Sequence, residues 1–352
     1  MKDFADLYTD YLITSSSYTT ATGMGSLLSI GHDKITRALS TGKYDSKFLW
    51  QQAKPYIEEL RDSKDISVLI FDDSIEAKPY TDESELNCWH FDHTVGRNVK
   101  GVNFLTALVE TGGMRIPCGV EFIRKDTWVT DENTGKQKRK SSVTKNELFR
   151  SMLRECDRKI DFQYVLADSW FSSVENMQCC KGELNQHFIM ALKSNRKVAL
   201  SEEDKNNKQY VSIESLRSGQ QTVEIWLEEL NFPLLLTQQV FKNENDTVGE
   251  LYLACSDLSL SYEQITTIYK RRWSVEEYHK SIKSNTGFAK SPTKTIQTQT
   301  HHYVLSIVAY LKLEWLKQRT RKNHFAMKSQ IYLAAQQAAY RELKKLSTPK
   351  AA

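Results

Sequence analysis

Two apolar runs of strand length stand out along the chain, and acidic residues follow both of them. Residues 66–71 read ISVLIF and lead directly into Asp72 and Asp73, while residues 162–167 read FQYVLA and lead into Asp168. A strand that is apolar on both faces is typical of the interior of a sheet covered by helices. Because α/β proteins gather functional groups where such strands end, the pattern predicts that these carboxylates converge.

The elements between and after these two strands predict an α/β core. Two strand-like runs flank the turn Thr111-Gly112-Gly113 and indicate a hairpin. Helical segments precede and follow the second apolar strand, and this alternation of helix and strand is typical of parallel pairing. The predicted ranges are strands 102–110 and 115–124, helices 145–158 and 174–184, and a further strand at 187–192.

The pattern changes again in the second half of the chain. Short alternating segments from residue 194 to about residue 259 predict antiparallel strands that form an insertion into the core. After Tyr262 the chain is predicted to be helical almost to its end. The resulting division has a helical region at 1–62, the first part of the core at 63–193, a β-rich subdomain at 194–260, a core helix within 261–300, and C-terminal helices at 301–352.

The N-terminal region has the pattern of a helix-turn-helix. Met24 would lie on the inner face of a first helix and Ile35 on that of a second, with small Gly25 where the two approach each other. In such a motif the second helix presents its exposed side chains to a groove of DNA. Lys34 and Arg37 are therefore candidate DNA-binding residues.

Charge is distributed unevenly along the 352 residues, whose net charge is only +4. Residues 266–352 contain seventeen Lys or Arg and four acids, a net charge of +13, so the remainder of the chain is acidic. A segment of this kind suggests a surface for a polyanion, most simply nucleic acid. The competing interpretation is a solvated basic helical tail. Residues 131–145 add a second basic segment, predicted to be a polar loop.

Several classes of protein do not fit this sequence. The longest apolar stretch, residues 303–311, is stopped by Lys312 and is too short to span a bilayer. The first twelve residues carry acids where a signal peptide needs a basic segment and an apolar run. The six cysteines form no C-x-x-C pair and have no zinc-finger spacing. We therefore expect a protein of the cytoplasm with no membrane partner and with reduced thiols.

A helix predicted around Glu276 has one charged face and one apolar face. Its charged stripe has spacings of 3, 4, 4 and 3 residues and consists of Tyr269, Arg272, Glu276, Lys280 and Lys283. Its apolar stripe, about 100° away, consists of Ile268, Val275 and Ile282. Exposed ion pairs between residues one turn apart would explain the charged stripe in isolation, but they contribute only tenths of a kcal/mol.

The acids after the two strands give Glu276 a more specific interpretation. Three converging carboxylates without a counterion would repel one another, and a bound divalent cation relieves that repulsion. A ligand set made only of oxygen atoms favours magnesium or manganese over zinc. Asp72 and Asp73 are adjacent, and the apolar strand before them has no alternation by which to choose between them.

These residues resemble a known family. Tyr269, Arg272, Glu276 and Lys283 match the pattern Tyr-x2-Arg-x3-Glu-x6-Lys, which is similar to the signature of the bacterial insertion-sequence transposases of the fourth family, within the DDE superfamily. The segments FDDS at 71–74 and VLADSWF at 165–171 resemble the family's two catalytic aspartates in their order along the chain. The strand-rich insertion before Glu276 is also similar.

The resemblance implies a fold and a mechanism. The fold would be α/β, a ribonuclease-H-like mixed sheet flanked by helices, with an inserted β-rich subdomain and an N-terminal helical DNA-binding region. Asp73, which precedes Ser74 as in the family, would act with Asp168 and Glu276 to bind two Mg²⁺ ions, for which Mn²⁺ can substitute. The activity would be cut-and-paste transposition of an insertion sequence, by DNA cleavage and strand transfer through a hairpin intermediate.

The resemblance also implies partners for the remaining residues. Tyr269, Arg272, Lys280 and Lys283 would bind DNA near the reacting strand. Trp226 is a candidate for stacking on a displaced base, although a core tryptophan is the commoner case. Double-stranded DNA, as terminal inverted repeats and target, would be bound by a homodimer associated with the bacterial nucleoid. The alternatives are a non-catalytic DNA-binding regulator derived from a transposase and a ribonuclease-H-like nuclease without strand transfer.

Overall fold

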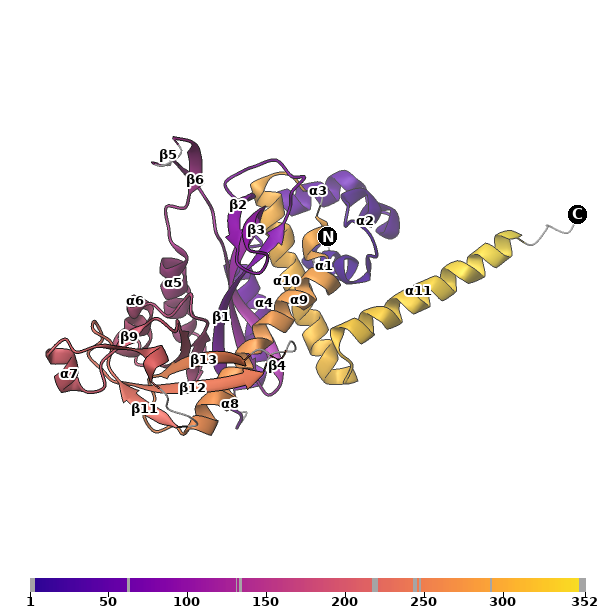
Figure 1. Ribbon diagram of the computed structural model, residues 1–352. Coiled ribbons are helices and arrows are strands. Elements are labelled where there is room, and N and C mark those ends of the chain that lie inside the picture. Colours follow the sequence, from indigo (N-terminus) through magenta and orange to yellow (C-terminus); the bar gives the residue numbers. More distant parts are fainter. Residues whose placement is uncertain are drawn as a thin grey trace, which may run out of the picture. The chain divides into compact units, whose positions relative to one another are not determined.

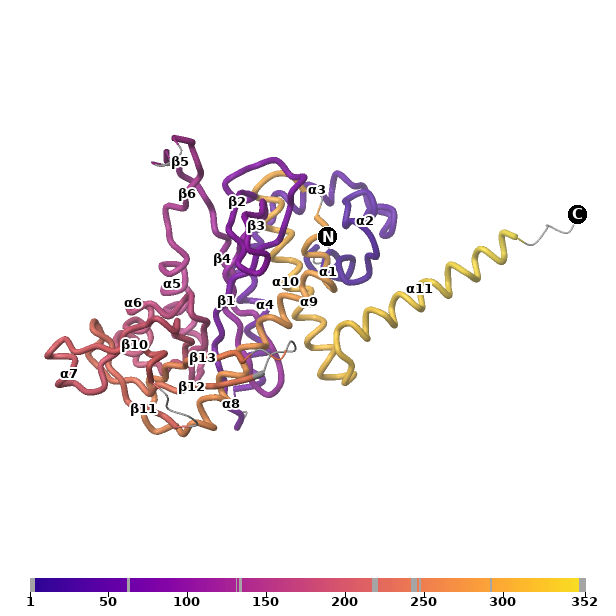
Figure 2. Tube along the Cα trace, in the orientation of Figure 1, coloured from indigo at the N-terminus to yellow at the C-terminus, as the bar shows by residue number. Residues whose placement is uncertain are grey.

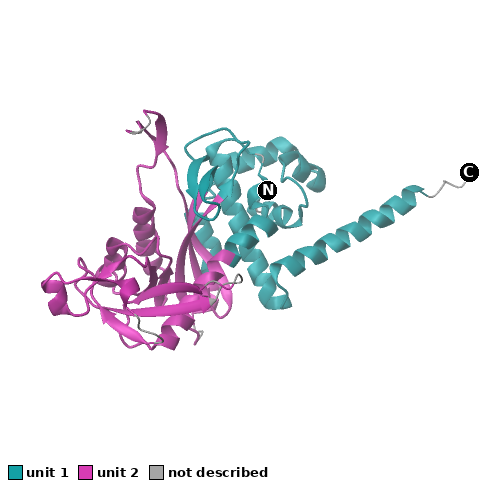
Figure 3. Ribbon diagram, in the orientation of Figure 1, with its two compact units in different colours: residues 1–54, 76–102, 277–352 teal, residues 55–75, 103–276 magenta. Residues whose placement is uncertain are grey.

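The computed structural model describes residues 4–61, 64–130, 132, 135–216, 221–242, 246, 248–291 and 293–347. The chain forms two compact units, which Figure 3 shows in different colours. Unit 1 combines residues 1–54, 76–102 and 277–352, and unit 2 combines residues 55–75 and 103–276. The sequence-based division into five consecutive segments is a different kind of division, and it stays a prediction.

A mixed sheet dominates unit 2 (Figure 1). Its strand order is β11-β12-β13-β8-β7-β1-β3-β2, with β4 also paired to β3, and β2 and the adjoining ends of β1 and β3 belong to unit 1. Among the described residues its nine strands are β1 (Val68–Ala77), β2 (Cys88–Asp92), β3 (Arg97–Thr111), β4 (Met114–Phe122), β7 (Tyr164–Ala167), β8 (His187–Leu192), β11 (Thr222–Ile225), β12 (Leu234–Lys242) and β13 (Val248–Cys255).

The centre of the sheet is parallel, as the alternation of helix and strand predicts. β1 pairs with β7 and β7 pairs with β8, both in parallel, and Phe71 lies opposite Ala167. The segment 68–71 and all of β7 are buried. A strand buried on both faces needs helices above and below it, which explains the continuous apolar runs.

A buried aromatic contact joins the sheet to the helix that precedes β7. This helix, α5 (Lys145–Asp157), begins at a capping box in which Thr144 accepts a hydrogen bond from the backbone of Glu147 and the Glu147 side chain accepts one from Thr144. The ring of Phe149 lies 4.5 Å from that of Phe71 and 5.5 Å from that of Phe171, measured between centroids. The cap defines where α5 starts, and the rings define which face it buries.

The predicted hairpin is confirmed as β3 and β4. Its turn contains Gly112 and Gly113 with φ of 56° and 75°, values that a residue with a Cβ rarely adopts. Two successive residues of positive φ form the tight turn that suits the twist of a two-stranded hairpin.

The strand β1 differs from the prediction because it does not end at the acids. It continues through Asp72 and Asp73 to Ala77, so both carboxylates lie inside a paired strand. Half-burial replaces full burial from Asp72 to Ile75. An apolar run marks where a strand is covered on both faces, and it carries no information about pairing that continues beyond that cover.

The strands expected as an inserted subdomain lie in the main sheet. β11, β12 and β13 form antiparallel pairs in that order, and β13 pairs with β8. They extend the sheet because β8 would otherwise present an open edge with unpaired backbone groups. The smaller elements of this part, which Figure 2 traces along the chain, are β9 (Lys197–Val198), α7 (Glu202–Asn206), β10 (Val211–Ser212) and η2 (Ile213–Ser215).

The basic segment predicted as a loop is partly a two-stranded ribbon. β5 (Thr127–Thr130) and β6 (Gln137–Lys140) pair in antiparallel fashion, apart from the main sheet. The other helices of unit 2 are α6 (Val174–Met177), its π-helical continuation η1 (Gln178–Glu183), α8 (Tyr262–Lys270) and the 3-10 turn η3 (Arg271–Trp273). Two helices run from one unit into the other, namely α4 (Ser46–Glu59) and α9 (Ser274–Asn285).

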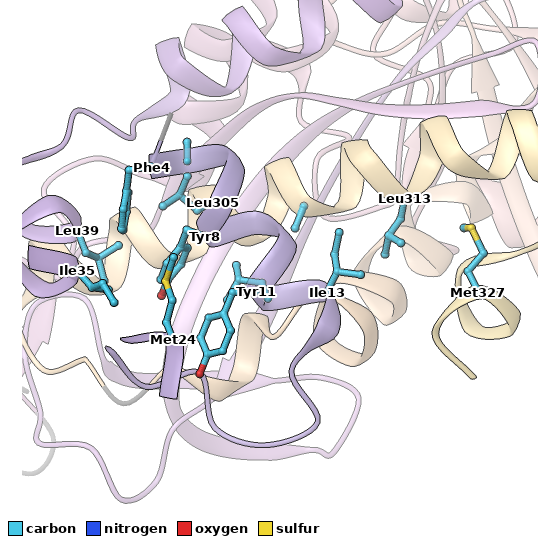
Figure 4. Close-up of a cluster of buried hydrophobic side chains, with 13 residues drawn as sticks. Phe4, Tyr8, Tyr11, Ile13, Met24, Ile35, Leu39, Leu305, Leu313 and Met327 are labelled. Carbon is cyan, nitrogen blue, oxygen red and sulfur yellow. The ribbon is translucent and has the colours of Figure 1, made fainter. Parts of the chain in front are cut away.

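Unit 1 is held together by helices from opposite ends of the chain. They are α1 (Phe4–Thr14), α2 (Ala21–Leu28), α3 (His32–Thr41), the short turn η4 (Phe288–Lys290), α10 (Ile296–Thr320) and α11 (His324–Ser347). Figure 4 shows their shared core, in which Tyr8, Met24 and Ile35 pack with Leu305 and Leu313. The N-terminal helices therefore share their hydrophobic core with α10.

The turn between α2 and α3 has the compact form that the sequence predicts. A Cβ added to Gly25 would lie 2.6 Å from the backbone oxygen of Ile30, so only glycine permits this approach. Ser29 ends α2 in the left-handed conformation, with φ 55° and ψ 40°. Met24 and Ile35 are buried, while Lys34 and Arg37 on α3 are exposed. Their contact with DNA stays a prediction.

The last helix is anchored by its first turns. In α11 the buried residues are His324, Met327 and Lys328, and the residues from Ala334 onward are exposed. Across the described ranges, no helix combines the length and apolar character that crossing a membrane requires.

Candidate active site

Parallel pairing brings the first two acidic positions together. Phe71 and Ala167 lie opposite each other in β1 and β7, so Asp72 and Asp168 follow at the same level of the sheet. Asp168 is the first residue after β7, and one of its carboxylate oxygens accepts a hydrogen bond of 3.0 Å from the backbone N–H of Trp170. Local backbone contacts thus orient this carboxylate.

Asp72 and Asp73 have different partners because successive side chains of a strand point to opposite faces. Both oxygens of Asp73 accept hydrogen bonds from the Lys145 ammonium, at 3.0 and 2.9 Å. Lys145 is the first residue of α5, and its ammonium also lies 4.4 Å from the centroid of the Trp170 ring. The helix cap at Thr144 therefore positions the cation that meets Asp73.

Arg272 connects Asp72 with Glu276. Its Nη2 donates a hydrogen bond of 2.8 Å to Glu276 Oε1, and its Nη1 lies 4.0 Å from an oxygen of Asp72. Arg272 belongs to η3 and Glu276 to the first turn of α9. The guanidinium also lies 5.9 Å from the ring centroid of Tyr269, whose hydroxyl donates to the backbone oxygen of Ala167. Tyr269 thus links this arginine to the end of β7.

The charges of this cluster are only partly balanced. Burial raises the pKa of Asp72 to about 8; the charges of Asp168, Asp73 and Glu276 act in the same direction, and Arg272 opposes them. Burial also raises the pKa of Asp168. Four carboxyl groups therefore face two cations, and added positive charge would favour their ionised forms.

The donor chemistry fits a divalent metal ion. In the part of the chain that the structure describes, no three metal-binding side chains are grouped closely enough to hold an ion; Arg272 and Lys145 contact the carboxylates instead. The available donors are carboxylate oxygens, which magnesium and manganese prefer. Asp72 or Asp73, together with Asp168 and Glu276, could hold such an ion once the two basic side chains withdraw.

A basic cleft of about 310 Å³ adjoins this cluster. It lies where β7 and β8 end, at the carboxyl edge where parallel sheets bind their ligands. Its lining residues are Ser169, Trp170, Ser172, Ser173, Lys193, Asn195, Arg196 and Lys197. Three cations, hydroxyl groups and an exposed indole suit a phosphate-containing chain.

Comparison with protein families identifies the superfamily. Residues 1–211 match a family described as DDE superfamily endonuclease, and residues 130–312 match one described as Transposase DDE domain. The chain belongs to the DDE superfamily. No curated protein matches it. The two matched regions overlap around Asp168 and together span the cluster described above, so the DDE superfamily predicted from the sequence is confirmed at this level. Its enzymes act on DNA with divalent metal ions, typically Mg²⁺.

The remaining residues of the charged stripe have other surroundings. Lys283 is half-buried in unit 1. Burial lowers its pKa, and the charges of Glu76 and Asp92 oppose that shift. Lys280 is exposed, with its ammonium 5.7 Å from the centroid of the Phe325 ring. The helix predicted as continuous is interrupted by the 3-10 turn η3, which tightens the backbone between Tyr269 and Glu276.

Trp226 has the environment of a core residue. Only 9% of it is exposed, its backbone bridges to Ala199, and the Lys205 ammonium lies 5.4 Å from its ring centroid. Packing accounts for these contacts, and base stacking by Trp226 stays an untested prediction.

Two basic residues of this DDE chain were not singled out from the sequence. Lys145 binds Asp73, and the Thr-x-x-Glu pattern at 144–147 was the available signal, because it marks where α5 begins. Arg271 donates hydrogen bonds to the side chain of Glu110 and to the backbone oxygen of Ile66. Arg271 thus serves the fold while its neighbour Arg272 serves the site.

Proposed function

We propose that this DDE superfamily chain is a DNA transposase that moves an insertion sequence by DNA cleavage followed by strand transfer. The observation that carries the proposal is the placement of Arg272, whose guanidinium lies 2.8 Å from Glu276 and 4.0 Å from Asp72. Together with the raised pKa of Asp72 and Asp168, it indicates a carboxylate site that suits added positive charge.

Asp73, Asp168 and Glu276 are the proposed ligands of two Mg²⁺ ions, for which Mn²⁺ can substitute. When bound, such ions would activate the attacking oxygen and stabilise the leaving oxygen of an in-line displacement. Asp73 is the aspartate favoured by the family resemblance, and Asp72 is the one next to Arg272. Lys145 and Arg272 contact Asp73 and Glu276 in the structure, and both would have to withdraw for these carboxylates to hold the ions.

The chain's own residues bind and orient the DNA strand. Arg272 has a planar fork of donors that suits phosphate, and Tyr269 braces it. Lys193 and Arg196 in the basic cleft lie where a strand that passes the carboxylates would place its phosphates. Lys280 and Lys283, on the same helix as Glu276, are proposed to bind backbone phosphates.

The proposed reaction consists of two kinds of displacement at phosphorus. Water attacks a phosphodiester at the element end, and the bond to the 3′-oxygen breaks to leave a free 3′-hydroxyl. That hydroxyl then attacks another phosphodiester, first on the opposite strand to form a hairpin and, after the hairpin is opened, on target DNA. Since two ends must be joined to one target, we propose that a homodimer holds them.

Recognition of the terminal inverted repeats is proposed to reside in unit 1. α3 exposes Lys34 and Arg37, and α2 and α3 would act as the helix-turn-helix predicted from the sequence. The basic C-terminal helices would add contacts to the DNA backbone that do not depend on sequence.

The test is cleavage of duplex DNA that carries the repeats flanking the gene, with Mg²⁺ or Mn²⁺. Native protein is compared with Glu276→Gln, and with Glu277→Gln as the matched control, since Glu277 is the exposed neighbour on the same helix turn. We expect metal-dependent nicking and hairpin formation by the native protein and the control. Glu276→Gln should bind the DNA but not cut it.

Other outcomes would point to the alternatives. Tight DNA binding without cleavage by the native protein would replace the proposal with a non-catalytic regulator. Cleavage without any joined product would replace it with a nuclease. Equal activity of Glu276→Gln and the native protein would remove Glu276 from the site.

A further inference from the structure

The β5–β6 ribbon of unit 2 is a separate structural element from the main sheet (Figure 1). It has four residue pairs in antiparallel register, from Thr127 opposite Lys140 to Thr130 opposite Gln137. Each of its strands is exposed or half-exposed at every position. A ribbon with neither face buried contributes no hydrophobic core to the fold, so packing does not explain its presence.

Side-chain contacts keep the ribbon in shape. The Arg139 guanidinium stacks over the Trp128 ring at 4.4 Å from its centroid, and Arg139 Nη1 donates to the backbone oxygen of Lys125 at 3.3 Å. At the base, both the backbone N–H and the hydroxyl of Ser142 donate to the carboxylate of Asp126. An isolated two-stranded ribbon is marginal in water, and these contacts hold this one in an extended form.

The register divides the ribbon into two chemically different faces. Directly opposed residues of an antiparallel pair point to the same side. Trp128 with Arg139 therefore occupies one face, and Lys138 and Lys140 occupy the other, opposite Val129 and Thr127. The first face carries the stacked pair. The second carries the two lysines two residues apart, about 7 Å along the strand.

The ribbon region is rich in positive charge. Between residues 124 and 140 there are six basic residues and three acids. The acids precede β6, and one of them, Asp126, is bonded to Ser142 at the base. The basic residues are Arg124, Lys125, Lys136, Lys138, Arg139 and Lys140.

We propose that the β5–β6 ribbon is an arm that binds duplex DNA outside the carboxylate site, with Lys138 and Lys140 directed at backbone phosphates. The major groove of B-DNA admits a two-stranded ribbon, and its rims are lines of phosphate that complement a lysine face. The inference rests on the proposed function in so far as DNA is the substrate. It adds a second DNA-binding surface that takes no part in the cleavage reaction.

The test compares the Lys138→Gln/Lys140→Gln double variant with Lys64→Gln/Lys208→Gln, which removes the same charge from exposed positions of unit 2 outside the ribbon. Binding of a repeat-free DNA duplex is measured over a series of salt concentrations. Each lost phosphate contact reduces the slope of log affinity against log salt by about 0.9. We expect the ribbon variant to lose about 1.8 from this slope and the control to keep the native slope.

Two further measurements make the result specific. Lys138→Arg/Lys140→Arg should restore the native slope, because it returns the charge on the same face. At saturating DNA, the cleavage rate of the glutamine variant should equal that of the native protein, since the arm does not touch the reacting atoms. A native slope in the glutamine variant would overturn the inference, and so would an equal loss of slope in the control. If the same measurement is made with duplex RNA, a loss of slope seen with RNA alone would also overturn it.

These outcomes are distinct from failure of the proposed function. If native protein binds and cleaves DNA but the ribbon variant behaves like the control, only the arm is excluded. If native protein does not bind duplex DNA, the transposase proposal and the arm both fall.

Discussion

Arg272 donates a hydrogen bond of 2.8 Å to Glu276 across the junction between η3 and α9, one helical turn apart. The same guanidinium lies 4.0 Å from Asp72, and the Arg272 side chain is only 17% exposed. One half-buried cation therefore serves two acids that approach from a strand and a helix. Removal of that cation takes an ionic partner from both acids, and the cost is larger at Asp72, whose side chain is only 16% exposed.

Arg272→Lys is expected to reduce DNA cleavage by about a hundredfold, in the range seen when a positioned donor is lost from an active site. Lysine keeps the charge but lacks the planar fork of donors that suits a DNA phosphate. Single-turnover cleavage at saturating metal and DNA is the measurement, with Lys270→Gln as a control at an exposed site nearby. A native rate in Arg272→Lys would show that charge alone is sufficient.

The roles of the adjacent residues Asp72 and Asp73 can be distinguished by replacing each with asparagine. We expect Asp73→Asn to lose at least about a hundredfold in metal-dependent cleavage, more than a supporting residue around a metal normally contributes. Asp72→Asn should lose less, since its role would be to hold Arg272. Both variants are assayed at several Mg²⁺ concentrations with the same DNA. The reverse order of activities would assign the metal to Asp72.

Metal binding should be visible as stability without any DNA present. A ligand at a hundred times its dissociation constant stabilises a folded protein by about 2.7 kcal/mol. We expect Mg²⁺ or Mn²⁺ to raise the thermal midpoint of the native protein and of Glu277→Gln, but not that of Glu276→Gln. An identical rise in all three proteins would mean that the ions bind elsewhere.

Much of the core could be predicted because buried strands and helices have recognisable apolar patterns in the sequence. The apolar run before Asp72 and the one before Asp168 are parallel neighbours, and the glycine turn at 112–113 closes the expected hairpin. These features depend on local composition and on periodicity. The same features predicted the buried face of the helix around Glu276, where Val275 is fully buried.

What could not be predicted depends on pairing partners that are distant in sequence. β1 extends past its apolar run, and β13 joins β8, because hydrogen bonds to a neighbouring strand do not require apolar side chains. The contact between Lys145 and Asp73 joins residues 72 positions apart. It arises from α5 lying over β1, a relationship that no single segment contains.

The α2–α3 turn offers a matched pair of stability variants. Ser29→Gly should stabilise unit 1 by up to about 1 kcal/mol, because Ser29 has φ 55° and glycine relieves that strain. Gly25→Ala should destabilise it, since the added Cβ would lie 2.6 Å from the Ile30 oxygen. Chemical denaturation of the two variants measures both effects. Destabilisation by Ser29→Gly, or stabilisation by Gly25→Ala, would contradict the turn geometry.

His302 makes the stability of unit 1 dependent on acidity. It is fully buried and accepts from the Tyr8 hydroxyl at Nδ1 while Nε2 donates to the Gly287 oxygen. Burial lowers its pKa to about 4 from the usual 6.5, and Lys78 acts in the same direction. The unfolded chain therefore takes up a proton first. The contribution of His302 to the free energy of unfolding is fully present above pH 6.5, and it falls by about 3 kcal/mol as the pH is lowered to 4.

The measurement is the free energy of unfolding at several pH values, with His302→Gln for comparison. The variant should have lower stability at neutral pH, because the two buried hydrogen bonds are replaced imperfectly. Its stability should nevertheless change less between pH 6.5 and 4 than that of the native protein. Equal slopes over this interval would show that His302 does not titrate as described.

Unit 1 combines three separate stretches of the chain. This arrangement determines when unit 1 can fold during synthesis. The apolar faces of α1, α2 and α3 pack against Leu305 and Leu313 on α10, roughly 300 residues later. A nascent chain must carry those faces uncovered until α10 has left the ribosome. Helices made first thus reach their native packing last, and until then they are targets for chaperones and for aggregation.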